Sequence, residues 1–152
     1  MGFLGRSITD HEWASSARAI LDAAIEPATA LSEAIEQEDI DRQVEAIGTI
    51  TLRFPSLRDS LRSGGSPTSA EARQAKKSLE LALQDYVDGA KQGYKLFVDL
   101  GEGLAGRATS GGFAGRAATS RIVFQKSMYE EIVKKAERRL EAARAFLHGA
   151  AA

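Results

Sequence analysis

The stretch from residue 72 to residue 100, ARQAKKSLELALQDYVDGAKQGYKLFVDL, decides the fold of this chain. Its apolar residues recur at steps of three or four, which is the period of an α-helix. The stripe consists of Ala72, Ala75, Leu79, Ala82, Leu83, Tyr86, Ala90, Gly93, Phe97 and Leu100. We therefore expect one helix over residues 69–101, roughly 45 Å long at 1.5 Å per residue.

Three further stretches carry the same period. The first spans residues 9–35, where Pro27 removes a backbone donor and predicts a kink. The second spans residues 39–62, with Asp39 as N-cap and a break near Pro55. The last spans residues 117–148. The expected apolar stripe of the second helix consists of Ile40, Val44, Ile47, Ile50 and Thr51.

Four amphipathic helices joined mostly by short connections predict an all-α, antiparallel up-down four-helix bundle with long third and fourth helices. A chain of 152 residues fits a single domain, over residues 1–152. Because the first two helices are shorter and interrupted by proline, the third and fourth could also form a hairpin that projects beyond them. The end of such a hairpin would be a natural place for self-association.

The composition limits the classes of function. Cysteine is absent, which excludes disulfides, thiol nucleophiles and thiolate metal sites. No apolar run approaches the roughly 18–20 residues of a membrane span, and no signal peptide is visible, so we expect no transmembrane segment and a cytoplasmic location. The net charge of −1 is unevenly spread, because residues 1–60 carry −6 and residues 103–152 carry +5.

Catalytic and metal-binding patterns are missing from the sequence. The two histidines, His11 and His148, lie near opposite ends of the chain, and neither follows a glutamate by three residues. Di-iron bundles need such Glu-x-x-His pairs on two helices. We therefore expect a non-enzymatic protein without a metal or cofactor.

The segment 101–120, GEGLAGRATSGGFAGRAATS, repeats itself and is rich in glycine. One interpretation is a loop between helices, since glycine clusters commonly punctuate structure. A second is that the small residues continue a helix and let another helix pack closely. A third is an anion site at the start of the fourth helix, where free amides favour negative charge. Its candidate residues are Arg107, Arg116, Thr119 and Ser120.

A second group of small residues lies inside the third helix. Gly89 and Gly93 each cost about 1 kcal/mol of helix stability relative to alanine, so a compensating feature is expected. That feature is either a close crossing of two helices or a groove that holds a small apolar molecule. The candidate ligand-binding residues are Tyr86, Gly89, Gly93 and Phe97, with Tyr94 beside them.

The last helix is basic, but acidic residues interrupt its positive surface, and this argues against a nucleic-acid partner. The long apolar stripes and the split charge favour a helical interaction or scaffold module, coiled-coil-like, that binds a protein partner or itself as a homo-oligomer. The alternative is a sensor or carrier bundle that binds a small apolar ligand, or an anion near residues 101–120.

Overall fold

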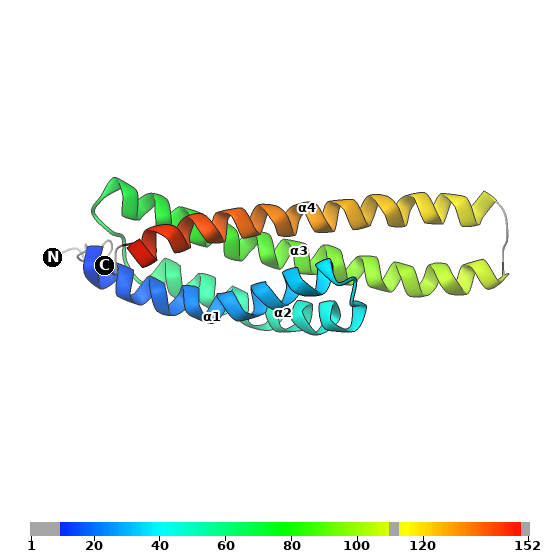
Figure 1. The fold of residues 1–152 in the computed structure, drawn as a ribbon, viewed down its shortest axis with the longest axis horizontal. Coiled ribbons are helices and arrows are strands. Elements are labelled where there is room, and N and C mark those ends of the chain that lie inside the picture. The colour runs from blue at the N-terminus through cyan, green and yellow to red at the C-terminus, as the bar shows by residue number, and fades with distance from the viewer. Residues whose placement is uncertain (1–9, 110–112, 150–152) are drawn as a thin grey trace.

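A computed structural model shows an all-α protein in which four helices follow one another along the chain (Figure 1). It describes residues 10–109 and 113–149, and within 102–119 it describes the backbone alone. The helices are α1 (Asp10–Glu36), α2 (Ile40–Ser63), α3 (Ala70–Thr109) and α4 (Phe113–Gly149). Consecutive helices run antiparallel and α1 also contacts α4, so the predicted up-down four-helix bundle is confirmed.

The helices α3 and α4 are much longer than the other two. With 40 residues, α3 is roughly 60 Å long, whereas the 27 residues of α1 span roughly 40 Å. Figure 1 shows α3 and α4 continuing together beyond the turn that joins α1 to α2. The molecule is therefore a four-helix bundle at one end and a two-helix hairpin at the other.

The helix boundaries differ from the predicted ones where glycine and proline guided the prediction. We expected α3 to end at residue 101 and α4 to begin near residue 117, but α3 continues to Thr109 and α4 begins at Phe113. Glycine is only a weak helix breaker, and pairing with a neighbouring helix overrides its propensity. Likewise α1 and α2 continue without a break through Pro27 and Pro55.

The hydrophobic core lies along the axis of the four-helix part. Of the ten stripe residues predicted for α3, all but the last two are buried, and Phe97 and Leu100 are partly buried. The rings of Phe54 and Tyr86 meet edge to face, with centroids 5.6 Å apart. Burial of large side chains such as Trp13 and Tyr86 stabilises the bundle by about 1.5–3 kcal/mol each.

An exposed N-cap and two buried hydrogen bonds of Gln43 fix the start of α2. The side chain of the N-cap Asp39 accepts a hydrogen bond from the Arg42 amide at 3.1 Å. The Gln43 amide nitrogen donates to the carbonyl of Ala34 at the end of α1, at 3.3 Å. The Tyr129 hydroxyl of α4 donates to the Gln43 oxygen at 3.0 Å, and burial raises the pKa of Tyr129. Through its two hydrogen bonds, Gln43 therefore ties α2 to both α1 and α4 at this end of the bundle.

Candidate interaction surface

The seam between α2 and α3 is closed over residues 54–63 of α2. There Phe54 packs on Tyr86, Arg58 donates a hydrogen bond to Gln84, and Arg62 pairs with Glu80. Leu61, in the same stretch of α2, is buried. We call this part of the seam, residues 54–63 with their partners on α3, the closed half.

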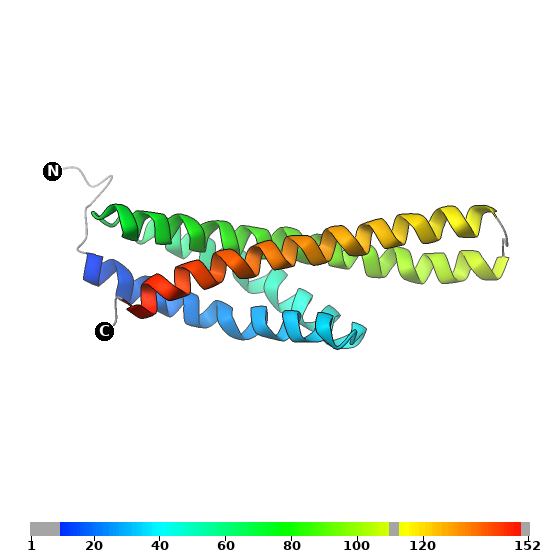
Figure 2. The ribbon, with the colours of Figure 1, turned by 45° about the horizontal axis from the view of Figure 1, so that its top comes forward.

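Over residues 40–52 the same seam is open. Figure 2 shows α2 diverging from α3 as it approaches the turn to α1. The divergence leaves a groove of about 880 Å³. Its α2 wall consists of Val44, Ile47, Gly48, Thr51 and Leu52, and its α3 wall of Ala90, Lys91, Tyr94, Phe97 and Val98. We call this part the open half and its cavity the α2/α3 groove.

Large apolar side chains stand exposed along the groove. Leu52 is 77% exposed and Tyr94 is 65% exposed. Val44, Val98 and the neighbouring Ile40 are also among the exposed large apolar residues. Single exposed apolar residues are ordinary, but a contiguous apolar patch with polar edges marks a binding surface.

The expected apolar stripe of α2 is therefore wrong as a buried stripe for Ile40, Val44 and Thr51, which are all exposed. Ile47 and Ile50 of that stripe are buried as expected. The reason is geometric, because residues at steps of four from Ile40 form a second stripe, displaced around the helix from the buried one. That second stripe consists of Ile40, Val44, Gly48 and Leu52.

Glycines along α2 and α3 fall into two environments. A Cβ added at Gly93 would lie 2.7 Å from both Ile47 Cδ1 and Tyr129 Cε1. A Cβ added at Gly89 would lie 3.2 Å from Val133 Cγ2. By contrast, a Cβ at Gly48 or Gly101 would meet nothing within 4 Å. Gly89 and Gly93 thus permit close helix packing inside the molecule, whereas no intramolecular contact explains Gly48 on the wall of the groove.

Exposed residues of opposite charge lie next in sequence to the groove residues of α2 and α3. On α2 the exposed acids Asp41 and Glu45 directly follow Ile40 and Val44, and on α3 the exposed Lys91 and Lys95 flank Tyr94. The ion pairs among the described side chains, those of residues 10–101 and 120–149, involve none of these four residues. We call them the acidic rim and the basic rim.

The residues predicted to bind a small apolar ligand do not form one site. Phe97 and its neighbour Tyr94 line the α2/α3 groove. Tyr86 is buried against Phe54, and Gly89 and Gly93 face side chains of α4 and α2. The close helix crossing, one of the two alternatives left open by the sequence, accounts for both glycines. Ligand binding at these four positions stays a prediction.

The predicted anion site falls mostly outside the described side chains, which do not include those of Arg107, Arg116 and Thr119. Ser120 is exposed. Because α4 begins at Phe113, the amides of Thr119 and Ser120 lie within the helix rather than at its start. The free-amide argument for these two residues is therefore wrong, and anion binding by the two arginines stays a prediction.

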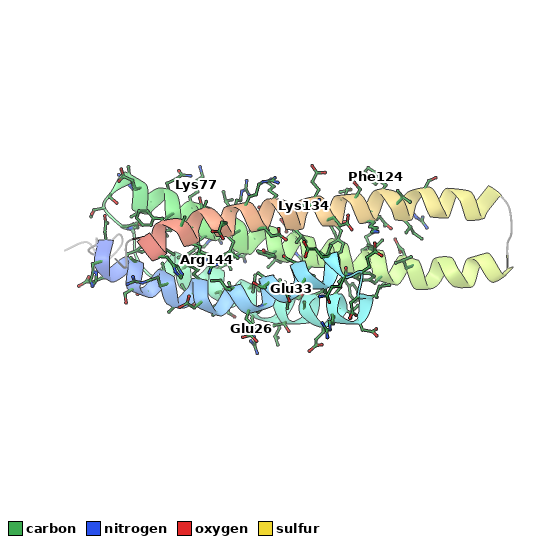
Figure 3. All side chains as sticks on the ribbon, viewed as in Figure 1. Glu26, Glu33, Lys77, Phe124, Lys134 and Arg144 are labelled. Carbon is green, nitrogen blue, oxygen red and sulfur yellow. The ribbon has the colours of Figure 1, made fainter. Side chains whose placement is uncertain are left out.

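A smaller apolar patch lies on the outer side of α4. It consists of Val123, Phe124 and Met128, of which Phe124 is 64% exposed and is labelled in Figure 3. No groove among those found in the described part of the chain is lined by these three residues. The patch offers apolar contact without a shaped surface.

A groove of about 300 Å³ with a mixed apolar and charged lining lies between α1 and α4. Glu33 of α1 and Lys134 and Arg144 of α4, labelled in Figure 3, are among its lining residues. At its base the Ser32 hydroxyl donates to a Glu137 carboxylate oxygen at 2.5 Å. Burial, and to a lesser degree the charge of Glu137, raises the pKa of Tyr86. These contacts hold α1 against α4.

Comparison with protein-family models, curated proteins and solved structures found no match. Across the described ranges 10–109 and 113–149, no three His, Asp or Glu side chains gather in a way that could hold a metal ion. No helix in the same ranges is long and apolar enough to cross a membrane. The α2/α3 groove, with its exposed apolar walls and its two charged rims, is thus the most developed candidate surface.

Sequence reasoning missed Gly48, Leu52 and Val98 as members of this surface. Their signal was present, because an α-helix in a bundle buries one apolar stripe and α2 carries two. The steps of four from Ile40 through Gly48 to Leu52 could have marked the second stripe. Its exposure could not be predicted, since it depends on how far α2 diverges from α3.

Proposed function

We propose that this protein is a non-enzymatic helical interaction module that associates with itself, and that the α2/α3 groove is the surface it uses. The observation that carries the proposal is the exposure of Leu52 and Tyr94 on facing walls of one groove. Both belong to helices that bury apolar residues well elsewhere. A second chain placed on the groove would remove these side chains from water.

The energetic argument is the hydrophobic effect. Complete burial of an apolar side chain of this size contributes about 1.5–3 kcal/mol. The groove offers four exposed side chains of this kind, Val44, Leu52, Tyr94 and Val98, each already partly covered. Association must also overcome the loss of rigid-body freedom, so a surface of this kind supports reversible self-association rather than a permanent complex.

The test is the mass of the protein in solution, measured by light scattering over a concentration series at low and high salt. We expect the mass to rise with concentration from the 16.3 kDa of one chain toward twice that value. Leu52→Glu places a charge in the groove at an exposed position, so it should hold the protein at the mass of one chain without unfolding it.

Val123→Glu serves as the matched control, because it introduces the same charge at a similarly exposed apolar residue on α4. We expect it to leave the association unchanged. If Val123→Glu abolishes association and Leu52→Glu does not, the interacting surface is the patch on α4. A single-chain mass for the unmodified protein at every concentration would overturn the proposal.

A second candidate function is a carrier of a small apolar ligand, favoured by the size of the groove and its aromatic walls, Tyr94 and Phe97. Ligand sites commonly have volumes of about 300–1,000 Å³ and apolar linings. An environment-sensitive apolar dye distinguishes the two functions. A carrier stays at the mass of one chain and binds the dye at one site that Leu52→Glu abolishes, whereas a self-associating module releases the dye as its concentration rises.

A further inference from the structure

The arrangement of charge around the α2/α3 groove shows how a second copy would be oriented. Asp41 and Glu45 lie on the exposed side of α2, and Lys91 and Lys95 lie on the exposed side of α3. These four residues therefore place two exposed acids on α2 across the groove from two exposed lysines on α3. A symmetric dimer that uses this surface brings the same two rims together twice.

A second copy can be placed on the groove symmetrically in two ways, which differ in the direction of the two-fold axis. If the two-fold axis runs across the groove, α2 lies over α2 of the partner and α3 over α3. Each acidic rim then faces an acidic rim, and each basic rim a basic one. If the axis runs along the groove, α2 lies over α3 of the partner and each acidic rim faces a basic one. Like charges placed face to face disfavour the first arrangement.

We propose that a second copy of this chain docks on the α2/α3 groove about a two-fold axis that runs along the groove, so that α2 of each copy packs on α3 of the other. This inference rests on the proposed self-association and adds its geometry. It assigns Glu45 and Lys95 to two symmetry-related intermolecular ion pairs, with Asp41 and Lys91 adding longer-range attraction between the rims.

The registration of α2 and α3 supports the pairing. Within one chain the helices are antiparallel, and Ile47 lies at the level of Gly93, where its Cδ1 atom fills the space of the missing side chain. Two residues back along α2 and two forward along α3, Glu45 lies at the level of Lys95. A two-fold axis along the groove preserves these levels, so it brings Glu45 of one copy opposite Lys95 of the other.

The glycine in the exposed stripe of α2 agrees with the same arrangement. Gly48 lies between Val44 and Leu52, and a Cβ at this position would meet no atom of its own chain within 4 Å. A helical glycine costs about 1 kcal/mol relative to alanine. Inside this protein, Gly93 allows α2 and α4 to approach α3 closely. In the dimer, Gly48 would allow a helix of the partner to approach α2 in the same way.

The experiment reverses one rim and then both, and measures the dimer dissociation constant by sedimentation equilibrium. Asp41→Lys with Glu45→Lys makes both rims basic, and Lys91→Glu with Lys95→Glu makes both rims acidic. We expect each double variant to weaken the dimer by about tenfold or more, since the attraction between the two rims, including both Glu45–Lys95 pairs, becomes repulsion. The variant carrying all four changes should recover dimerisation to within about threefold of the unmodified protein, because its rims are again opposite.

The control for net charge is Asp22→Lys with Glu26→Lys, which makes the same change at two exposed acids spaced four apart on α1. We expect it to leave the dissociation constant unchanged. Circular dichroism of each variant checks helix content, and recovery in the quadruple variant shows that Asp41→Lys acts on the interface rather than on α2.

Each outcome decides a separate point. If the unmodified protein dimerises through Leu52 but neither double variant weakens it, the rims do not face each other and the axis along the groove is overturned, while the proposed self-association stands. Weakening without recovery in the quadruple variant overturns the pairing as well. If the unmodified protein does not dimerise, the proposed function itself fails.

Discussion

The closed and open halves of the seam between α2 and α3 involve the same two helices, but the closed half is packed and the open half exposes apolar side chains. In the closed half, Phe54 fills the space against Tyr86, and Arg58 and Arg62 cover the edge with polar contacts. In the open half, α2 diverges and leaves Leu52 and Tyr94 exposed. The direction in which α2 diverges from α3 is fixed by contacts outside this seam, because Gln43 holds the start of α2 to α1 and α4.

The comparison shows that apolar residues on one helix serve two purposes, some packing in the core and others forming an exposed surface. Residue type alone does not distinguish the two. Buried residues of the closed half stabilise the fold, so their loss should destabilise the single chain. Exposed residues of the open half contribute little to the single chain, so their loss should affect association alone. Substitutions that separate stability from association test this division.

The largest contrast is expected between Phe54→Ala and Leu52→Ala, two residues apart on α2. Phe54 is fully buried, so its truncation should lower the free energy of unfolding by about 3–5 kcal/mol. Leu52 is mostly exposed, so its truncation should change that free energy by less than about 0.5 kcal/mol. Urea unfolding at a concentration where the chains are single measures both. A large loss of stability for Leu52→Ala would contradict the division.

A smaller loss is expected for Gly93→Ala, at the level where Ile47 of α2 packs on α3. The new methyl group would lie 2.7 Å from Tyr129 Cε1, and the ring cannot move freely because its hydroxyl donates to Gln43. Overpacking costs about 1–3 kcal/mol, which outweighs the gain of about 1 kcal/mol in helix propensity. We expect a net loss of up to about 2 kcal/mol in urea unfolding. A stabilised variant would mean that α2 and α4 can move away from α3 at this level to make room for the methyl group.

Gly48→Ala should act in the opposite direction on the single chain. The added methyl group meets nothing within 4 Å, so the change should raise the free energy of unfolding by about 1 kcal/mol. The measurement is made in the Leu52→Glu background to exclude the dimer. In the unmodified background the same change should weaken association, since the partner helix loses its close approach. If Gly48→Ala strengthens association, the packing of a helix on this glycine is excluded.

The sequence was sufficient to predict the bundle because the stripe of α3, from Ala72 to Leu100, repeats with little interruption. It was insufficient wherever one residue type has two roles. Gly101 and Pro55 were interpreted as breaks but lie within α3 and α2, because neighbouring helices compensate for weak local propensity. Val44 was assigned to the core but is exposed, because the direction of α2 depends on contacts between Gln43 and residues distant in sequence.

The smallest effect is expected at the end of the bundle where the closed half terminates. Asp10, at the start of α1, accepts hydrogen bonds from the Thr68 amide at 2.7 Å and the Thr68 hydroxyl at 3.0 Å, just before α3 begins. Hydrogen bonds from the side chain of Ser69 and the backbone of Thr68 lower the pKa of Asp10 from 3.8 to about 2. The folded state therefore favours the ionised carboxylate.

A pKa lowered in the folded state makes a stabilising contribution that is complete above the unfolded value, near pH 4, and is lost as the pH falls toward 2. Asp10→Asn lacks this contribution at every pH. We expect the melting temperature of the unmodified protein to exceed that of Asp10→Asn at pH 5 and the difference to shrink between pH 4 and pH 2. The side chain lies near the surface, so the difference should be smaller than the losses expected for Phe54→Ala and Gly93→Ala. A difference that stays constant down to pH 2 would show that the link between α1 and Thr68 does not depend on the charge of Asp10.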